Sequence, residues 1–137
     1  MANFVGNWNQ IERTNVDAFI ALLEVPDDKK AKARENAKSV KTTVKFEGGA
    51  LNITMTMPAG TREVKLVVGQ DTTYTASSGK KMLINTTEIT DNSAKAIVKS
   101  EDGSKEWGTL NSSVAGDTLT MTMKLFDVES VSTFKKA

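Results

Sequence analysis

The side chains that most often perform covalent or metal chemistry are missing from this sequence. Its 137 residues include no cysteine and no histidine. This excludes thiol nucleophiles, serine–histidine–aspartate triads, and zinc sites that use histidine or cysteine ligands. Carboxylate or lysine chemistry remains possible in principle. We nevertheless expect a protein that is not an enzyme and that holds no metal and no cofactor.

Arginine is the side chain best suited to hold an anionic group away from water, and the sequence has only three. These are Arg13, Arg34 and Arg62. A buried carboxylate is costly unless it is paired with a charge, and the planar guanidinium offers two parallel hydrogen bonds. Whether this chain can bind an anion therefore depends on the elements that position these residues.

The bulk properties favour one small globular domain over residues 1–137. A formal net charge of +1 gives no reason to expect nucleic acid as a partner. No apolar run approaches the roughly 18 residues that span a bilayer. The chain starts Met1-Ala2-Asn3 without a charged or apolar leader, so we expect no signal peptide, a cytoplasmic location and a monomer.

Helical patterning is confined to about residues 15–37. Asn15 is a typical N-cap, whose side-chain oxygen can accept from the first-turn amides. Apolar residues then recur at helical spacing, at Val16, Phe19, Ile20 and Leu23. After Pro26 a second helix, over about 28–37, is small on one side and basic on the other. We expect it to pack weakly at the surface.

From residue 38 onward the hydrophobic period changes to two, which indicates half-buried antiparallel strands. Leu51, Ile53, Met55 and Met57, for example, alternate with polar residues, and Leu119, Met121 and Met123 do the same. Turn sequences such as Gly48-Gly49 and Asp102-Gly103 separate these runs at short intervals. About ten strands are predicted, including one before the helices. The pattern is typical of an up-and-down β-barrel whose open end the helical pair covers.

The amino-terminal residues carry a family resemblance. Phe4-Val5-Gly6-Asn7-Trp8, followed by Asn15-Val16-Asp17-Ala18-Phe19-Ile20, resembles the opening of the intracellular lipid-binding proteins, the fatty acid-binding and cellular retinoid-binding family. The resemblance extends over the whole chain. It implies a flattened, ten-stranded clamshell barrel with a helix-turn-helix lid and a cavity for a lipophilic ligand. Trp8 is then expected to plug the closed end.

The resemblance also exposes a gap in the expected binding site. Fatty acid-binding members hold the ligand carboxylate with an Arg-x-Tyr pair on the last strand and a second arginine two strands earlier. Here the corresponding residues are Ser132-Thr133-Phe134, and a residue within Leu110-Asn111-Ser112. The usual cation is thus absent. Burial of apolar surface, at about 25 cal/mol per Å², can hold a chain without it. Any carboxylate is expected to point outward, toward Arg62 or the second helix.

The ligand-facing side chains are predicted mainly from strand alternation, with small polar residues to bind a neutral headgroup or water. They are Val16, Ile20, Val40, Ile53, Met55, Met57, Asn111, Met121, Met123, Ser130, Ser132 and Phe134. Methionine walls would adapt to varied ligands. Entry is expected between the second helix and the turn at residues 57–59, facing a turn at 76–78. Portal and membrane-contact residues are predicted to be Lys29, Lys30, Lys32, Arg34, Ala59 and Arg62.

The sequence therefore predicts non-covalent binding and intracellular transport of a hydrophobic small molecule, a fatty acid or other lipid. The basic second helix suits transient contact with anionic membranes, although a solvated helix face is the simpler interpretation. The alternative function is a structural, stress-protective or membrane-associating barrel in which lipid binding is incidental. The missing carboxylate anchor keeps that alternative open.

Overall fold

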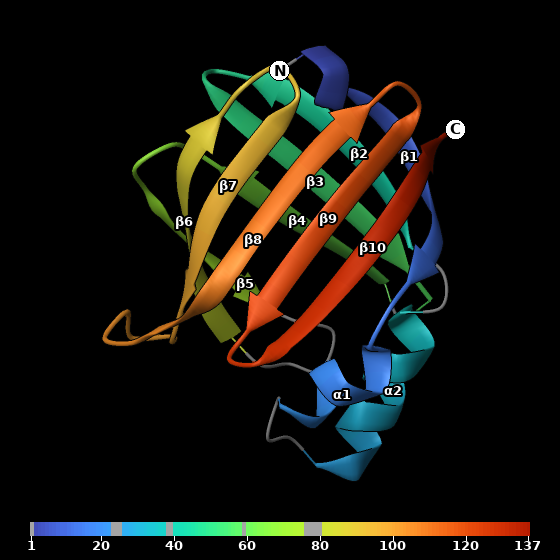
Figure 1. Ribbon diagram of the computed structural model, residues 1–137, viewed down its shortest axis with the longest axis vertical. Coiled ribbons are helices and arrows are strands. Elements are labelled where there is room, and N and C mark those ends of the chain that lie inside the picture. Colours follow the sequence, from blue (N-terminus) through green and yellow to red (C-terminus); the bar gives the residue numbers. More distant parts are fainter. Residues whose placement is uncertain (1, 23–25, 38–39, 59, 76–80) are drawn as a thin grey trace.

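Ten antiparallel strands form one nearly closed barrel in the computed structural model, which describes residues 2–22, 26–37, 40–58, 60–75 and 81–137 (Figure 1). A short 3-10 turn (Ala2–Phe4) precedes the first strand, and two helices follow it. The helices are α1 (Val16–Ala21) and α2 (Asp27–Ala37). The strands are β1 (Gly6–Arg13), β2 (Lys41–Glu47), β3 (Ala50–Met57), β4 (Gly60–Leu66), β5 (Asp71–Thr75), β6 (Lys81–Ile89), β7 (Ser93–Lys99), β8 (Glu106–Ala115), β9 (Thr118–Leu125) and β10 (Val128–Lys136).

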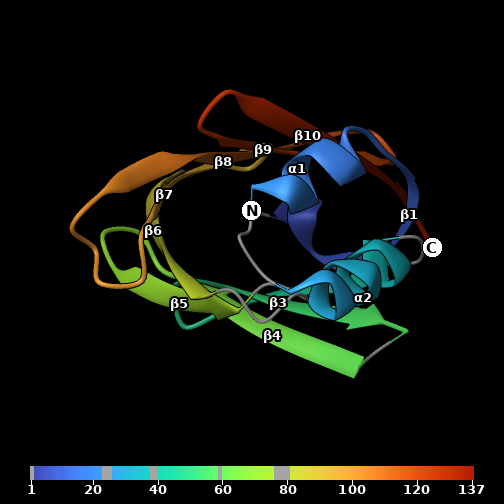
Figure 2. The ribbon, with the colours of Figure 1, turned by 90° about the horizontal axis from the view of Figure 1, so that it is seen from below.

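Each strand pairs with its neighbours in sequence, and β1 also pairs with β10. The order across the sheet is β4-β3-β2-β1-β10-β9-β8-β7-β6-β5, so β4 and β5 are its two edges. At this seam the Thr72 hydroxyl donates to the Lys65 carbonyl oxygen at 2.7 Å. Seen from the helical end, the barrel is flattened, with β8–β10 in one wall and β3 and β4 in the other (Figure 2). The predicted ten-stranded up-and-down barrel is confirmed.

Strand alternation packs the closed end of the barrel. In β3, Leu51 and Ile53 are buried, whereas Thr56 is exposed, as a period of two requires. Trp8 is 1% exposed and lies in one apolar cluster with Phe4 and Leu119. Its indole Nε1 donates to the Phe4 carbonyl oxygen at 3.0 Å, which satisfies the polar edge of a buried ring. Trp8 thus occupies the plug position expected from the sequence.

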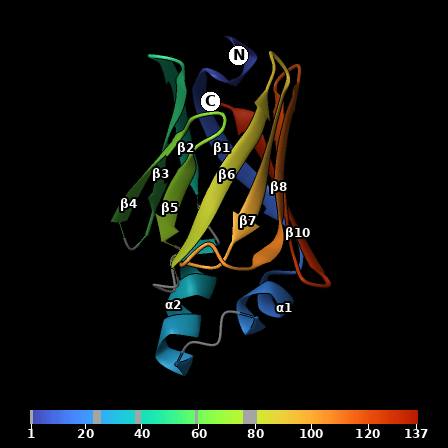
Figure 3. The ribbon, with the colours of Figure 1, turned by 90° about the vertical axis from the view of Figure 1, so that its left-hand side faces the viewer.

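The two helices lie across the opposite end of the barrel (Figures 2 and 3). Phe19 and Ile20 are the buried residues of α1, in agreement with the predicted apolar stripe. On α2, Ala33 is buried, whereas most of the other described side chains are exposed. An exposed ion pair joins the helices, from Arg34 Nε to Asp17 Oδ1 at 2.7 Å. Neither helix has the length and apolar character needed to cross a membrane. Leu23 lies outside the described residues.

The start of α1 differs from the predicted side-chain cap. Asn15 occupies the N-cap position, but it adopts a left-handed conformation with φ of 53° and makes no capping hydrogen bond through its side chain. Instead its Nδ2 donates to the Glu129 carbonyl oxygen at 2.8 Å, which ties the helix to β10. Asparagine tolerates this backbone conformation better than most residues. Its role is therefore to turn the chain and anchor it, and the expectation of a side-chain cap is wrong.

Candidate functional site

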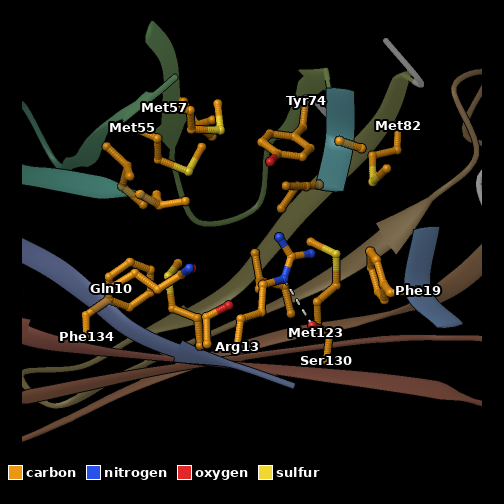
Figure 4. A pocket seen from close by; sticks show the side chains of 18 of the residues that line it. Gln10, Arg13, Phe19, Met55, Met57, Tyr74, Met82, Met123, Ser130 and Phe134 are labelled. Atoms are coloured by element: carbon orange, nitrogen blue, oxygen red, sulfur yellow. Dashed lines mark hydrogen bonds between the residues drawn. The ribbon is translucent and has the colours of Figure 1, made fainter. Parts of the chain in front are cut away.

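The barrel encloses a cavity of about 150 Å³ between its walls and the helical end. Most of its surface is apolar or thioether, and residues of both helices and of most strands contribute (Figure 4). The lining residues are Gln10, Arg13, Phe19, Ile20, Ala33, Val40, Ile53, Met55, Met57, Val64, Leu66, Tyr74, Met82, Ile84, Leu110, Met121, Met123, Ser130, Ser132 and Phe134. Among the described residues, no three acidic side chains gather as a potential metal site.

Most of the sequence-predicted ligand residues lie in this wall. The cavity-lining members of that set are Ile20, Val40, Ile53, Met55, Met57, Met121, Met123, Ser130, Ser132 and Phe134. Those on β3, β9 and β10 come together because each of these strands presents alternate side chains to the interior. Ile20 comes from α1, and Val40 directly precedes β2. The contact of these lining residues with a ligand stays a prediction, whereas their position in the wall is observed.

Two predicted ligand residues lie elsewhere. Val16 borders a groove on the outside of the barrel, whereas Phe19 and Ile20 of the same helix line the cavity. Asn111 is exposed on the outer face of β8, whereas its neighbour Leu110 lines the cavity. A slip of one residue along a strand moves a side chain to the opposite face. Asn111 therefore does not face the cavity.

The predicted portal residues are only partly described. Lys29, Lys32 and Arg34 are exposed on α2, and Lys30 is half-buried. Arg62 is half-buried on β4, directly opposite the cavity residue Met55. Ala59 and the turn at 76–78 lie outside the described residues, so the entry route stays a prediction.

Arg13 is the one charged residue among the described cavity residues that the predicted ligand set lacks. Its Nε donates to the Ser130 hydroxyl at 3.2 Å, and that hydroxyl donates to the Thr14 carbonyl oxygen at 2.9 Å (Figure 4). The guanidinium carbon also lies 5.7 Å from the centre of the Phe19 ring, within the range of a cation–π contact. Burial lowers the pKa of Arg13, although a guanidinium remains protonated in proteins.

An irregularity in β1 brings Arg13 to the interior. The register against β10 shifts between Gln10 and Glu12, so Ile11 is an extra residue that bulges from the ladder. Gln10 pairs with Phe134, and Arg13 pairs with Ser132. Without the bulge, a period of two would place Gln10 and Arg13 on opposite faces. With it, both residues line the cavity.

Gln10 and Arg13 also form a partition between the cavity and the outside. Both residues border a second, more open groove of about 440 Å³, together with Ile11, Glu12, Val16, Asp17 and Arg34. Ile11, the bulge residue, is 58% exposed in this groove. The acidic residues Glu12 and Asp17 lie on the outer side. On the inner side, Arg13 donates its hydrogen bond to Ser130, which also lines the cavity.

A small cavity of about 20 Å³ lies at the closed end, next to the main one. Met121 and Ile53 border both, and the small cavity adds the hydroxyl residues Thr42 and Ser112. The buried Thr42 hydroxyl has no hydrogen-bond partner among the described residues. The closed end therefore presents only neutral polar groups among its described residues, whereas the charged residue of the main cavity wall is Arg13.

Comparison with known proteins gives relatives that match the entire chain. No family model matches it. "Fatty acid-binding protein type 2" of Fasciola hepatica is 26% identical over 136 residues, 99% of each chain. "Fatty acid-binding protein 1" of Fasciola gigantica is 27% identical over 137 residues, the whole of both. Among solved structures, a Schistosoma mansoni fatty acid-binding protein in complex with arachidonic acid has a TM-score of 0.85 at 17% identity. It covers 100% of this chain, which covers 98% of it.

Three observations agree with this similarity. The amino-terminal motif carries the resemblance, the ten-stranded barrel with two helices after β1 reproduces the fold, and the relatives match from end to end. The chain is similar to fatty acid-binding proteins along its whole length, in sequence and in fold.

Proposed function

We propose that this protein binds a long-chain fatty acid or a similar lipophilic molecule in the barrel cavity and carries it, without catalysing a reaction. The observation that carries the proposal is an enclosed, predominantly apolar cavity whose wall includes five methionines, Met55, Met57, Met82, Met121 and Met123. Transfer of an alkyl chain from water to such surface is favourable by about 0.8 kcal/mol per buried CH₂. The names of the relatives support a fatty acid as the ligand class and favour the carrier over a purely structural barrel.

Titration with cis-parinaric acid, a fluorescent fatty acid, tests this function. We expect saturable one-to-one binding, because the structure has one main cavity within its described residues. Oleate should displace the probe. Organic extraction of the purified protein, followed by mass spectrometry, should identify a co-purifying lipid. A probe that does not saturate or cannot be displaced, together with an empty extract, would contradict the carrier function.

We further propose that α2 contacts anionic membranes during ligand transfer. Lys29 and Lys32 are exposed on this helix, which lies at the end where α1 and α2 cover the barrel (Figure 3). Each cation near an anionic surface contributes roughly 1 kcal/mol. Asp27 and Asp28 in the first turn oppose part of that attraction.

Ligand transfer to vesicles tests the membrane contact. In Lys29→Gln/Lys32→Gln, we expect transfer of the fluorescent fatty acid to phosphatidylserine-containing vesicles to slow by up to about tenfold. Transfer to neutral phosphatidylcholine vesicles should change little. Lys45→Gln/Lys124→Gln removes the same charge from exposed positions on β2 and β9 and is the matched control. Equal slowing in both double variants would argue against a role specific to α2.

A further inference from the structure

The cavity wall contains one charged side chain among its described residues, and that is Arg13. The other polar lining residues, Gln10, Tyr74, Ser130 and Ser132, are neutral types. A cation in a largely apolar enclosure is costly unless an anion or several acceptors compensate it. The presence of Arg13 in this cavity therefore needs a physical explanation.

Among the described residues, no partner neutralises this cation. No described carboxylate forms an ion pair with Arg13, and its hydrogen bond to a described residue is the one from Nε to Ser130. Because a guanidinium has five N–H groups, those on the two Nη atoms remain available to a ligand. Figure 4 shows the Nη end directed into the cavity, away from β10.

The surroundings hold the guanidinium in this orientation. Ser130 is 4% exposed, and its hydroxyl bridges Arg13 Nε to the Thr14 carbonyl oxygen. The Phe19 ring lies beside the guanidinium at 5.7 Å. A cation that is fixed before the ligand arrives loses less conformational entropy on binding than a free side chain does.

Tyr74 supplies a second donor across the cavity. Its phenol oxygen faces the guanidinium of Arg13 from the opposite wall (Figure 4). Burial raises the pKa of the Tyr74 phenol, and the positive charges of Arg13 and Arg62 oppose that shift only in part. The phenol is therefore protonated at neutral pH and can donate a hydrogen bond to an anion.

We propose that Arg13 is the headgroup anchor of this protein and binds the carboxylate of a fatty acid within the cavity, with Tyr74 as a neighbouring donor. This inference rests on the proposed function and deepens it. The anion occupies the middle of the barrel on the helical side, and the hydrocarbon chain lies against the methionine and aliphatic walls. The cation that β10 lacks at Ser132 is supplied by the residue directly opposite it on β1.

Displacement of Nile red, a neutral lipophilic dye, separates headgroup binding from cavity binding. Laurate and dodecanol have the same hydrocarbon length and differ in charge. For the unmodified protein we expect laurate to displace the dye at a concentration roughly ten- to a hundred-fold lower than dodecanol does. In Arg13→Gln that advantage should disappear, while the affinities for Nile red and dodecanol stay within about threefold of the original.

Lys45→Gln is the control, because it removes an exposed cation on β2 that does not line the cavity, and it should leave the laurate advantage intact. Nuclear Overhauser contacts from the methylene next to the carboxylate of laurate should reach the Arg13 and Ser130 side chains. Equal affinity for laurate and dodecanol in the unmodified protein would overturn the anchor, and so would contacts to Thr42 instead. In either case saturable Nile red binding would leave the proposed function standing. If no ligand bound saturably, both the headgroup anchor and the proposed carrier function would be contradicted.

Discussion

Trp8→Ala is expected to lower the free energy of unfolding by about 3–5 kcal/mol, a large part of the stability of a domain of this size. The side chain is 1% exposed and packs in the closed-end cluster with Phe4, Leu51 and Leu119. Truncation would leave a void among aliphatic residues on several strands, and these cannot move together to fill it. It would also leave the Phe4 carbonyl oxygen without its indole donor. Urea unfolding followed by circular dichroism measures the loss.

Two further variants show whether the loss comes from burial. Trp8→Phe keeps most of the apolar volume but loses the indole donor, so we expect a cost of about 1–2 kcal/mol. Trp107→Ala deletes the same atoms from a half-buried position beside Phe126, where the rings are 6.0 Å apart. Its cost should be clearly below that of Trp8→Ala. Equal losses for the two alanine variants would show that Trp8 does not plug the barrel.

Regular strands made most of the fold and cavity predictable from the sequence. From Leu51 onward in β3, and throughout β9, polar and apolar residues alternate, so the inward positions of Met55, Met57, Met121 and Met123 follow directly from the pattern. The predicted helical stripe of Val16, Phe19, Ile20 and Leu23 likewise includes Phe19 and Ile20, which line the cavity. These positions depend on local periodicity alone.

The anchor could not be found in the same way, because it depends on a bulge. Counting by two from Trp8 predicts Gln10 and then Glu12 on the inner face, and it places Arg13 outside. The extra residue at Ile11 reverses that order. No residue type in Gln10-Ile11-Glu12 is specific to a bulge. The nearest signal for an inward charge was the adjacent pair Glu12-Arg13. Neighbouring residues on a strand point to opposite faces, so one of these two charged side chains is expected on the inner face.

The error at Asn111 has the opposite origin. Here the strand is regular around the residue, with Ser112 and Val114 buried on the inner face. The family comparison located the relevant position only to within three residues, and an uncertainty of one residue is enough to reverse the face. Strand alternation, with Leu110 and Ser112 inward, was the better guide.

Because β1 pairs with β10, the positive charge that binds the headgroup can be moved from residue 13 to residue 132. Residue 132 lies directly opposite Arg13 in the ladder, and both side chains line the cavity. Directly opposed residues on one face of an antiparallel pair have Cβ atoms about 4.5–5.5 Å apart. An arginine side chain is longer than that separation. A guanidinium carried by residue 132 can therefore reach nearly the same part of the cavity.

Arg13→Gln/Ser132→Arg is accordingly expected to recover laurate affinity by about tenfold or more relative to Arg13→Gln alone. The control is Arg13→Gln/Thr133→Arg, which adds the same charge one residue along β10, at a position that does not line the cavity. Displacement of Nile red by laurate and by dodecanol measures the recovery, and it should appear for laurate alone. If both double variants recover equally, the charge acts through the field of the whole protein. If only the residue-132 variant recovers, the carboxylate is bound at the Arg13–Ser132 pair, and the register of β1 against β10 determines where this barrel holds its ligand.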